Sequence, residues 1–121
     1  IEYCLKSDEL GDPHISSEHI LNLGLCDFDE LELIDEYSLR INDVLRSTFF
    51  SIGINLIDFK LEFGICKKTN KLVLADEISP DTCRLWDLKT NKKLDKDRFR
   101  RDLGNVEEAY AEVLDRLNLK I

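Results

Sequence analysis

The sequence lacks several features that would assign it to a familiar class of protein. It has no apolar run near the roughly 20 residues of a membrane-spanning helix, and residues 1–13 have neither the basic start nor the apolar stretch of a signal peptide. Basic residues are in the minority, with 17 Lys and Arg against 25 Asp and Glu, which argues against broad affinity for nucleic acid. We therefore expect a cytoplasmic protein with neither a membrane nor a nucleic acid as partner.

Cysteine pairs with metal-binding or redox spacing are also missing. The four cysteines include no Cys-x-x-Cys motif, which argues against a zinc knuckle and against a thioredoxin-like redox site. His14 and His19 are five residues apart around a predicted helix start, a poor spacing for two ligands on one helical face. We expect reduced, mostly packed thiols and two histidines with structural or surface roles.

What the sequence does contain fits one packed domain. Its 121 residues and hydrophobic fraction of 43% are enough for an ordinary core. A strand-like start is followed by a predicted loop over residues 8–15. A short helix should come next, with Ser16 or Ser17 as its cap and Gly24 as its stop.

A longer amphipathic helix is predicted to follow. Asp27 and Glu30 have the spacing of a capping box, and Gly53 marks the end of the helical run. Apolar residues recur at helical intervals between them: Leu31, Ile34, Ile41, Leu45 and Phe49. We expect this helix to pack on the core.

After Gly53 the apolar period changes from 3.6 to 2, which predicts a strand. Its two faces are expected to be a core face with Ile57, Phe59, Leu61 and Phe63, and a charged face with Asp58, Lys60 and Glu62. Residues 72–78 predict a second strand, which completes a β-hairpin, and residues 79–93 are expected to be irregular.

The C-terminal part is predicted to be helical, first over residues 95–104 and then, after a cap at Asn105, through residue 119. The second of these helices has an apolar stripe made of Val106, Ala109, Tyr110, Val113, Leu114 and Leu117. We expect this stripe to face the core.

The predicted hairpin brings two carboxylates together. With a three-residue turn over 68–70, the numbers of every facing pair sum to 138, which sets Glu62 directly opposite Asp76. A five-residue turn keeps this register and a four-residue turn spoils it. Facing carboxylates cost up to about 1 kcal/mol unless a cation lies between them. Because no His or Cys accompanies them, magnesium with a nucleotide phosphate is the natural hypothesis.

The alternative for this face is a purely solvated strand. Asp58, Lys60 and Glu62 alternate along it, and Lys60 would reduce the repulsion between the carboxylates. Periodicity alone leaves both interpretations open.

A second charged group lies further along the chain. It concentrates cations in an otherwise acidic sequence: Arg84, Lys92, Lys93, Lys96, Arg98, Arg100 and Arg101. Lys96 and Arg100 are four residues apart and so share a helical face, which suits a phosphate or a carboxylate. The alternative is a solvated helix face whose cations pair with nearby acids, namely Asp95, Asp97 and Asp102.

The chain resembles the C-terminal portion of the phosphoribosylaminoimidazole-succinocarboxamide synthases, the SAICAR synthetase family. Four stretches, in this order, carry the resemblance: LKSDELGDP, VLRSTFFSIGINLIDFKLEFG, LADEISPDTCRLWD and KLDKDRFRRDLG. It implies an α+β, two-lobed fold related to the ATP-grasp enzymes. Residues 1–121 would form its C-terminal lobe, a β-hairpin sheet packed with helices that binds ATP, magnesium and ribonucleotide.

The family uses ATP and magnesium to join L-aspartate to carboxyaminoimidazole ribonucleotide (CAIR) in purine biosynthesis, which gives SAICAR, ADP and phosphate. The resemblance therefore implies a carbon–nitrogen ligase that acts through an acyl phosphate. Such chemistry depends on positioning and on neutralising charge around the transferred phosphoryl group. The expected partners are ATP, CAIR, L-aspartate and further copies of the chain in a homo-oligomer.

The resemblance also implies roles for individual residues. Glu62 and Asp76 would hold nucleotide-bound magnesium, and Lys6 would reach the ATP phosphates. Lys60 would join the two carboxylates in catalysis. Seven further residues would bind the ribonucleotide or line its site: Asp12, Asp58, Ser79, Asp81, Arg84, Lys96 and Arg100.

The sequence departs from the family in one respect. Family members carry a preceding region with a lysine-bearing, glycine-containing loop over the nucleotide and an arginine motif for the ribonucleotide, and neither is found in these 121 residues. We expect a fragment of a longer chain that binds nucleotide weakly by itself. A small-molecule kinase and a non-catalytic interaction module remain the alternative functions.

Overall fold

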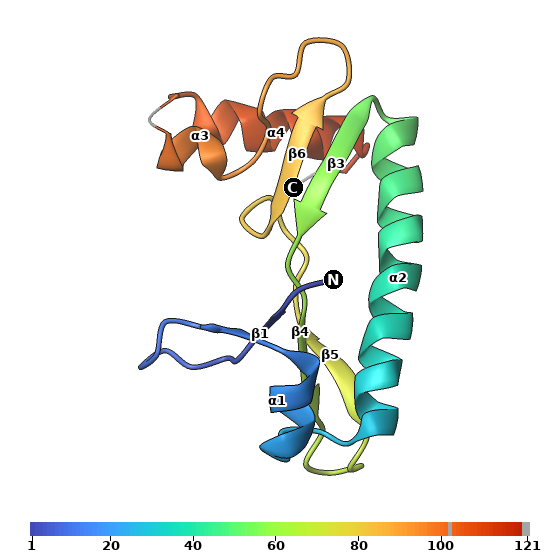
Figure 1. The fold of residues 1–121 in the computed structure, drawn as a ribbon. Coiled ribbons are helices and arrows are strands. Elements are labelled where there is room, and N and C mark those ends of the chain that lie inside the picture. The colour runs from blue at the N-terminus through green and yellow to red at the C-terminus, as the bar shows by residue number, and fades with distance from the viewer. Residues whose placement is uncertain (102, 120–121) are drawn as a thin grey trace. The chain divides into compact units, whose positions relative to one another are not determined.

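The computed structural model describes residues 1–101 and 103–119, which form a mixture of helices and strands (Figure 1). They divide into two compact units, residues 1–40 and residues 41–121. Within the described residues, none of the helices has the combination of length and hydropathy that a membrane span requires.

Unit 1 begins with a small antiparallel pair, β1 (Tyr3–Cys4) and β2 (His14–Ile15). The expected loop over residues 8–15 is therefore correct except for its last two residues. Helix α1 (Ser17–Asn22) follows, and the Ser16 side chain accepts a hydrogen bond from the backbone N–H of His19 at 3.2 Å. The predicted serine cap is thus confirmed.

Helix α2 (Phe28–Ser51) runs across the boundary between the two units. Its predicted capping box is confirmed, because Glu30 N donates to Asp27 Oδ1 at 2.8 Å and Asp27 N donates to Glu30 Oε1 at 3.2 Å. Gly53 follows the helix with a φ of 78°, a conformation that favours glycine. All five residues of the predicted apolar stripe are buried or half-buried.

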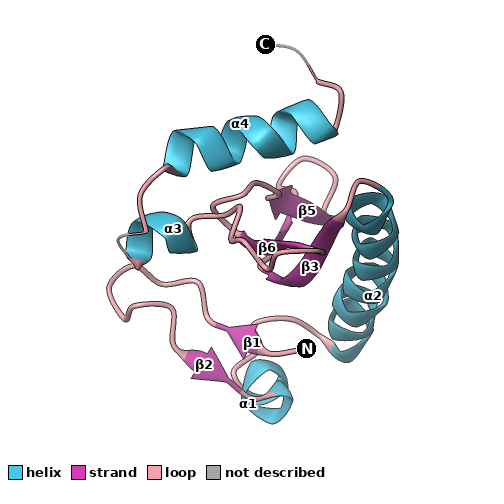
Figure 2. Cartoon of the chain, turned by 90° about the horizontal axis from the view of Figure 1, so that it is seen from above, coloured by secondary structure: helices cyan, strands magenta, loops and turns pink. Residues whose placement is uncertain are grey.

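In unit 2, β3 (Ile54–Phe59) pairs with β6 (Cys83–Asp87) in an antiparallel sheet, as Figures 1 and 2 both show. The expectation that residues 79–93 are irregular was therefore wrong for residues 83–87. Strand β6 supplies buried residues to the core, and the partner that stabilises it lies far away in the sequence.

Strand β3 contains one extra residue, Ile57. The register pairs Leu56 with Leu85 and then Asp58 with Arg84, so a β-bulge lies between Leu56 and Asp58. Ile57 is 40% exposed, which makes its predicted place in the core wrong. The bulge reverses the face of the residues beyond it, so Leu56 enters the core and Asp58 faces Arg84 on the other side.

The predicted hairpin forms a separate pair, β4 (Glu62–Ile65) with β5 (Leu72–Asp76). Its turn has four residues, because Cys66 pairs with Lys71 through a backbone hydrogen bond of 2.9 Å. The expected three-residue turn was wrong. Glu62 nevertheless lies opposite Asp76, since a second bulge at Ala75 shifts the register by one residue.

Two helices complete unit 2: α3 (Asp97–Arg100) and α4 (Val106–Arg116). Helix α3 is shorter than the predicted helix over 95–104, and Asp102 lies outside the described residues. Asn105 occupies the N-cap position of α4, but its side chain makes no capping hydrogen bond because its backbone is left-handed, with a φ of 55°. That predicted cap was wrong.

The core of unit 2 forms between the β3–β6 sheet, α4 and the C-terminal part of α2. It consists of Phe49, Ile54, Leu56, Cys83, Leu85, Leu94, Ala109 and Val113. Tyr110 and Leu117 of the predicted α4 stripe pack against this core. All four cysteines are free thiols, as expected, and burial raises the pKa of Cys83 to about 11.

Asp87 connects the end of β6 with α4 and with the turn that follows β6. Its Oδ1 accepts from Arg116 Nη2 at 2.7 Å, and its Oδ2 accepts from the backbone N–H groups of Lys89 and Thr90 at 3.0 and 2.8 Å. Arg116 Nη1 also donates to the carbonyl of Gly53 at 3.1 Å. The Arg116 contact, followed by those from Thr90, lowers the pKa of Asp87.

We predict that Leu85→Ala destabilises the longest encoded form of the protein by about 2–5 kcal/mol, because Leu85 is 1% exposed and pairs with Leu56 inside the core. Leu88→Ala is the matched control, since this leucine is 38% exposed, and it should cost no more than about 1 kcal/mol. Urea unfolding measures both values. Equal losses in the two variants would contradict the assignment of Leu85 to the core.

We predict that Asp87→Asn removes a stabilisation that depends on pH. Because the folded pKa is below the unfolded value of about 4, the carboxylate stabilises the fold fully above about pH 5 and progressively less as the pH falls through about 4. The variant should be less stable than the unaltered protein near neutral pH, and the difference should shrink in acid. Urea unfolding across this pH range tests the prediction, and a pH-independent difference would refute it.

Candidate functional site

Nine of the eleven candidate residues belong to unit 2 and two belong to unit 1. In unit 2 they fall into three groups: the acids at the ends of β4 and β5 with Lys60, the cations on β6 and around α3 with Asp58, and the polar loop before β6.

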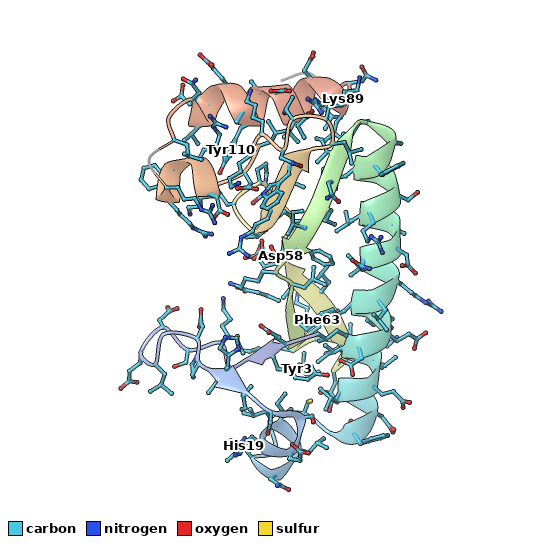
Figure 3. All side chains as sticks on the ribbon, turned by 45° about the horizontal axis from the view of Figure 1, so that its top comes forward. Tyr3, His19, Asp58, Phe63, Lys89 and Tyr110 are labelled. Atoms are coloured by element: carbon cyan, nitrogen blue, oxygen red, sulfur yellow. The ribbon has the colours of Figure 1, made fainter. Side chains whose placement is uncertain are left out.

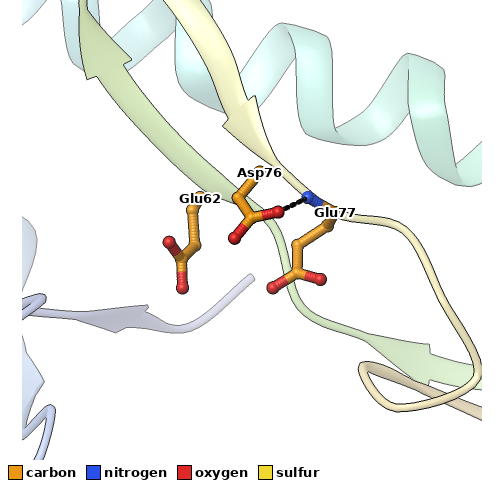
Figure 4. Close-up of side chains that lie close together, drawn as sticks. All are labelled: Glu62, Asp76 and Glu77. Carbon is orange, nitrogen blue, oxygen red and sulfur yellow. Dashed lines mark hydrogen bonds between the residues drawn. The ribbon is translucent and has the colours of Figure 1, made fainter.

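The first group is a cluster of carboxylates, Glu62, Asp76 and Glu77 (Figure 4). Each offers an oxygen, and these oxygens all lie within 4.8 Å of one another. Asp76 Oδ1 also accepts a hydrogen bond from the backbone N–H of Glu77 at 2.8 Å. The predicted convergence of Glu62 and Asp76 is confirmed.

Glu77 is a member of this cluster that the sequence reasoning missed. Strict alternation along a strand sends Glu77 to the face opposite Asp76. The strand ends at Asp76, however, and Glu77 adopts a φ of 100°, so the alternation stops where it would have separated the two side chains. The adjacent acidic pair in the sequence was the one available signal.

Lys60 lies beside the cluster, with its Nζ 2.6 Å from Glu62 Oε1. The Glu62 side chain is 13% exposed, so this carboxylate is largely removed from water. The Lys60 ammonium carries one positive charge and the three carboxylates together carry three negative charges. The Lys60–Glu62 ion pair by itself therefore offsets one of the three negative charges. Clustered hard oxygen ligands suit magnesium, which accepts carboxylate, water and phosphate oxygens.

The second group is centred on Arg84. Its Nη1 donates to Asp58 Oδ2 at 2.7 Å and its Nε donates to Asp97 Oδ2 at 3.1 Å. Asp58 and then Asp97 raise the pKa of Arg84 further, so this guanidinium is a permanent cation. Such a planar group suits recognition of a phosphate or carboxylate.

Lys96 and Arg100 lie at the two ends of the α3 turn, where the backbone N–H of Arg100 donates to the Lys96 carbonyl at 3.0 Å. This spacing confirms that the two residues are one helical turn apart. Arg100 Nη1 lies 3.5 Å from Asp97 Oδ1. The solvated-face alternative, in which all nearby acids are surface partners, was wrong for Asp95 and Asp97, because both are buried.

The third group is the loop that contains Ser79 and Asp81. The backbone N–H of Asp81 donates to Ser79 Oγ at 3.2 Å, and Tyr110 Oη donates to Asp81 Oδ1 at 2.6 Å. Figure 3 labels Tyr110 on α4 and Asp58 on β3. Burial, followed by the Asp81 hydrogen bond, raises the pKa of Tyr110, so its hydroxyl acts as the donor. Tyr110 was predicted only as a packing residue.

Lys6 and Asp12 lie in unit 1. Asp12 Oδ1 accepts from the backbone N–H of Ser7 at 2.7 Å, and Asp12 has a φ of 51°, so it belongs to the turn between β1 and β2. The function of Lys6 and Asp12 together with the residues of unit 2 stays a prediction.

The described site therefore offers two kinds of chemistry. The carboxylate cluster suits a divalent cation, and the arginines of β6 and α3 suit an anionic group. A ligand that combines phosphates with a bound cation would use both.

Comparisons with known proteins identify relatives of this chain. A family model described as SAICAR synthetase matches residues 1–117. The phosphoribosylaminoimidazole-succinocarboxamide synthase of Clostridium novyi (strain NT) is 58% identical over 117 residues, which cover 97% of this chain and 49% of that protein. The chain spans about half the length of the curated relatives it matches.

Solved structures are similar over the same length. The crystal structure of phosphoribosylaminoimidazole-succinocarboxamide synthase from Ehrlichia chaffeensis matches with a TM-score of 0.94 and 54% identity, over 99% of this chain and 52% of that one. A SAICAR synthetase in complex with ADP matches with a TM-score of 0.89 and 50% identity, over 96% of this chain and 49% of that one. The resemblance expected from the motifs is confirmed: the chain belongs to the SAICAR synthetase family.

Proposed function

We propose that the protein containing these residues is an ATP-dependent ligase that joins L-aspartate to CAIR in purine biosynthesis and releases SAICAR, ADP and phosphate. The observation that carries the proposal is the convergence of Glu62 and Asp76 on one hairpin of a family member. The ADP bound to a related synthetase supports a nucleotide as one of the ligands.

Magnesium fits the carboxylate cluster. Glu62 and Asp76 are the ligands we assign to it, and the Glu77 oxygen within 4.8 Å of both is available as a third. When bound, magnesium neutralises charge on the nucleotide phosphates. Lys60, paired with Glu62, orients that carboxylate, and Lys6 is assigned to the ATP phosphates.

The cationic side chains of Arg84, Lys96 and Arg100 are assigned to anionic groups of CAIR. Arg84 is fixed by two carboxylates and therefore presents its guanidinium in one orientation. Ser79 and Asp81 contribute polar contacts from a loop that Tyr110 holds at Asp81. The two remaining residues assigned to this substrate are Asp58 and Asp12.

The proposed reaction has two steps. An oxygen of the CAIR carboxylate attacks the γ-phosphorus of ATP, which forms an acyl phosphate and releases ADP. The aspartate amine then attacks the acyl carbon, loses a proton, and phosphate leaves as the amide forms. The residues of this chain contribute by binding and orienting the reactants, which can account for a large part of a rate enhancement.

The remaining expectations belong to the same proposal. The chain would form the C-terminal lobe of a two-lobed fold related to the ATP-grasp enzymes. Four free thiols favour a reducing compartment such as the cytoplasm. Val44 and Phe50 on α2, which are 65% and 67% exposed, supply apolar surface for assembly into a homo-oligomer.

The first test measures ADP release by the longest encoded form of the protein supplied with ATP, magnesium and CAIR. We predict that continued ADP release, beyond the first turnover, requires L-aspartate and ceases when magnesium is chelated with EDTA. Release that ignores aspartate would favour the kinase, and an intact, folded protein that releases no ADP would favour the interaction module.

We predict that Glu62→Gln and Asp76→Asn each lower the aspartate-dependent turnover by at least about a hundredfold, because each removes one charged ligand of the cation. Glu108→Gln is the matched control, since this glutamate is exposed on the first turn of α4, and it should keep full turnover. Thermal unfolding of each variant monitors the fold. Full activity in the two hairpin variants would refute the metal assignment.

A further inference from the structure

Asp97 is a buried carboxylate that contacts two arginines. Only 5% of the residue is exposed. Its Oδ2 accepts from Arg84 Nε at 3.1 Å, and its Oδ1 lies 3.5 Å from Arg100 Nη1. The two arginine side chains are 46% and 53% exposed. Asp97 therefore links a cation of β6 with a cation of α3 from the buried side of both.

A second buried acid, Asp95, attaches Asp97 to β6. Asp95 is 1% exposed, and its two oxygens accept from different elements. Oδ1 accepts from the backbone N–H of Asp97 at 2.8 Å, and Oδ2 accepts from the backbone N–H of Leu85 at 2.6 Å. Because Leu85 is the neighbour of Arg84, one carboxylate fixes the start of α3 against the strand that carries this arginine.

Arg84 is also held from a second direction. Its Nη1 donates to Asp58 Oδ2 at 2.7 Å, and Asp58 lies opposite Arg84 in the β3–β6 pair. The two contacts use Nε and Nη1, and Nη2 takes part in neither. Since a guanidinium is planar and its donors are fixed in a fork, two contacts determine where the third nitrogen points.

A structural ion pair needs only one arginine. A partly exposed arginine contributes little stability, whereas a buried carboxylate without any partner is costly. The second arginine comes from another element and places a second positive charge beside the same carboxylate. Two guanidinium groups repel each other, and the carboxylate between them offsets that repulsion. Two cations held together in this way suit a multiply charged anion such as a phosphate ester.

We propose that Asp97 is a positioning residue that holds Arg84 and Arg100 together as one binding site for an anionic group of the substrate. The inference rests on the proposed function, which assigns both arginines to the ribonucleotide. Asp97 acts through the arginines and does not itself touch the substrate. Asp95 supports it by fixing its backbone.

Simple electrostatics predicts the opposite outcome when this carboxylate is neutralised. Removing a negative charge from beside two cations makes the site more positive, which by itself tightens the binding of an anion. Loss of positioning weakens the same binding. Asp97→Asn separates the two effects, because Asn has nearly the same shape, accepts through one oxygen, and presents an N–H donor where the second arginine needs an acceptor.

The experiment titrates CAIR and, separately, inorganic phosphate into the longest encoded form of the protein without ATP, by calorimetry. We predict that Asp97→Asn weakens the binding of both at least about tenfold. In steady-state assays KM for CAIR should rise by a similar factor, while KM for ATP and kcat change less than about threefold. Asp115→Asn on α4 makes the same charge change at an exposed position and should leave every value unaltered.

Each outcome decides the inference. Unchanged or tighter binding of phosphate by Asp97→Asn overturns it, as does the absence of phosphate binding in the unaltered protein. If the unaltered protein binds phosphate but not CAIR, the proposed function fails, and the effect of Asp97→Asn on phosphate still decides whether Asp97 positions an anion site.

Arg84→Lys tests the same Arg84–Asp97 interaction by changing the arginine, and it replaces Asp97→Asn if that variant unfolds. Lysine keeps the charge but loses the fork that spans Asp58 and Asp97. It should also weaken phosphate binding about tenfold. Phosphate affinity that survives Arg84→Lys unchanged would show that the fixed orientation of the guanidinium is irrelevant, and the inference would fall.

Discussion

Side chains alternate between the two faces of a β-strand, and the arrangement of unit 2 depends on this alternation. Two strand pairs each contain one extra residue, which changes the face on which the residues beyond it lie. A regular β3 would send Asp58 to the same face as Leu56. With Ile57 as the extra residue, Leu56 meets Leu85 in the core and Asp58 meets Arg84 on the opposite face. In β5 the extra residue is Ala75, and it returns Glu62 to a position opposite Asp76 after a four-residue turn. Both bulges thus determine the position of a carboxylate.

Two classes of acid in unit 2 differ in their partners. Asp87, Asp95 and Asp97 are buried, and each accepts hydrogen bonds from backbone N–H groups, arginines or both. Glu62, Asp76 and Glu77 have oxygens within 4.8 Å of one another at a strand end, in addition to the Lys60 contact of Glu62 and the backbone N–H that donates to Asp76. Acids of the first class hold elements together, which offsets the cost of burying their charge. Those of the second class bring three negative charges close together, of which Lys60 offsets one, and this crowding of carboxylates distinguishes candidate ligands from structural acids.

Local signals in the sequence predicted local structure well. The Ser16 cap, the box formed by Asp27 and Glu30, and the length of α2 were correct, because each depends on residues a few positions apart. Strand β6 was missed because its alternating residues follow Pro80, and the partner that makes it a core strand is almost 30 residues earlier. Asn105 has the residue type of a cap but a backbone conformation that prevents one.

Candidate site residues show the same division. The motifs indicated Glu62, Asp76 and Arg84 correctly as members of charged groups, although the register argument for the first two assumed the wrong turn. The solvated-face alternative placed Asp95 and Asp97 at the surface, because a sequence pattern does not show that buried backbone N–H groups are available to a charged residue. Their burial depends on tertiary contacts with β6.

The order of the site residues along the chain has a genetic consequence. Nine of the eleven candidates lie between Asp58 and Arg100, on strands, turns and a helix that belong to one compact unit. A recombination event between two related genes that breaks outside this stretch transfers all nine together, with the bulge at Ala75 and the three buried aspartates, Asp87, Asp95 and Asp97. The segment can therefore be inherited, or exchanged between relatives in the laboratory, as a single cassette whose internal contacts have already been selected to fit one another.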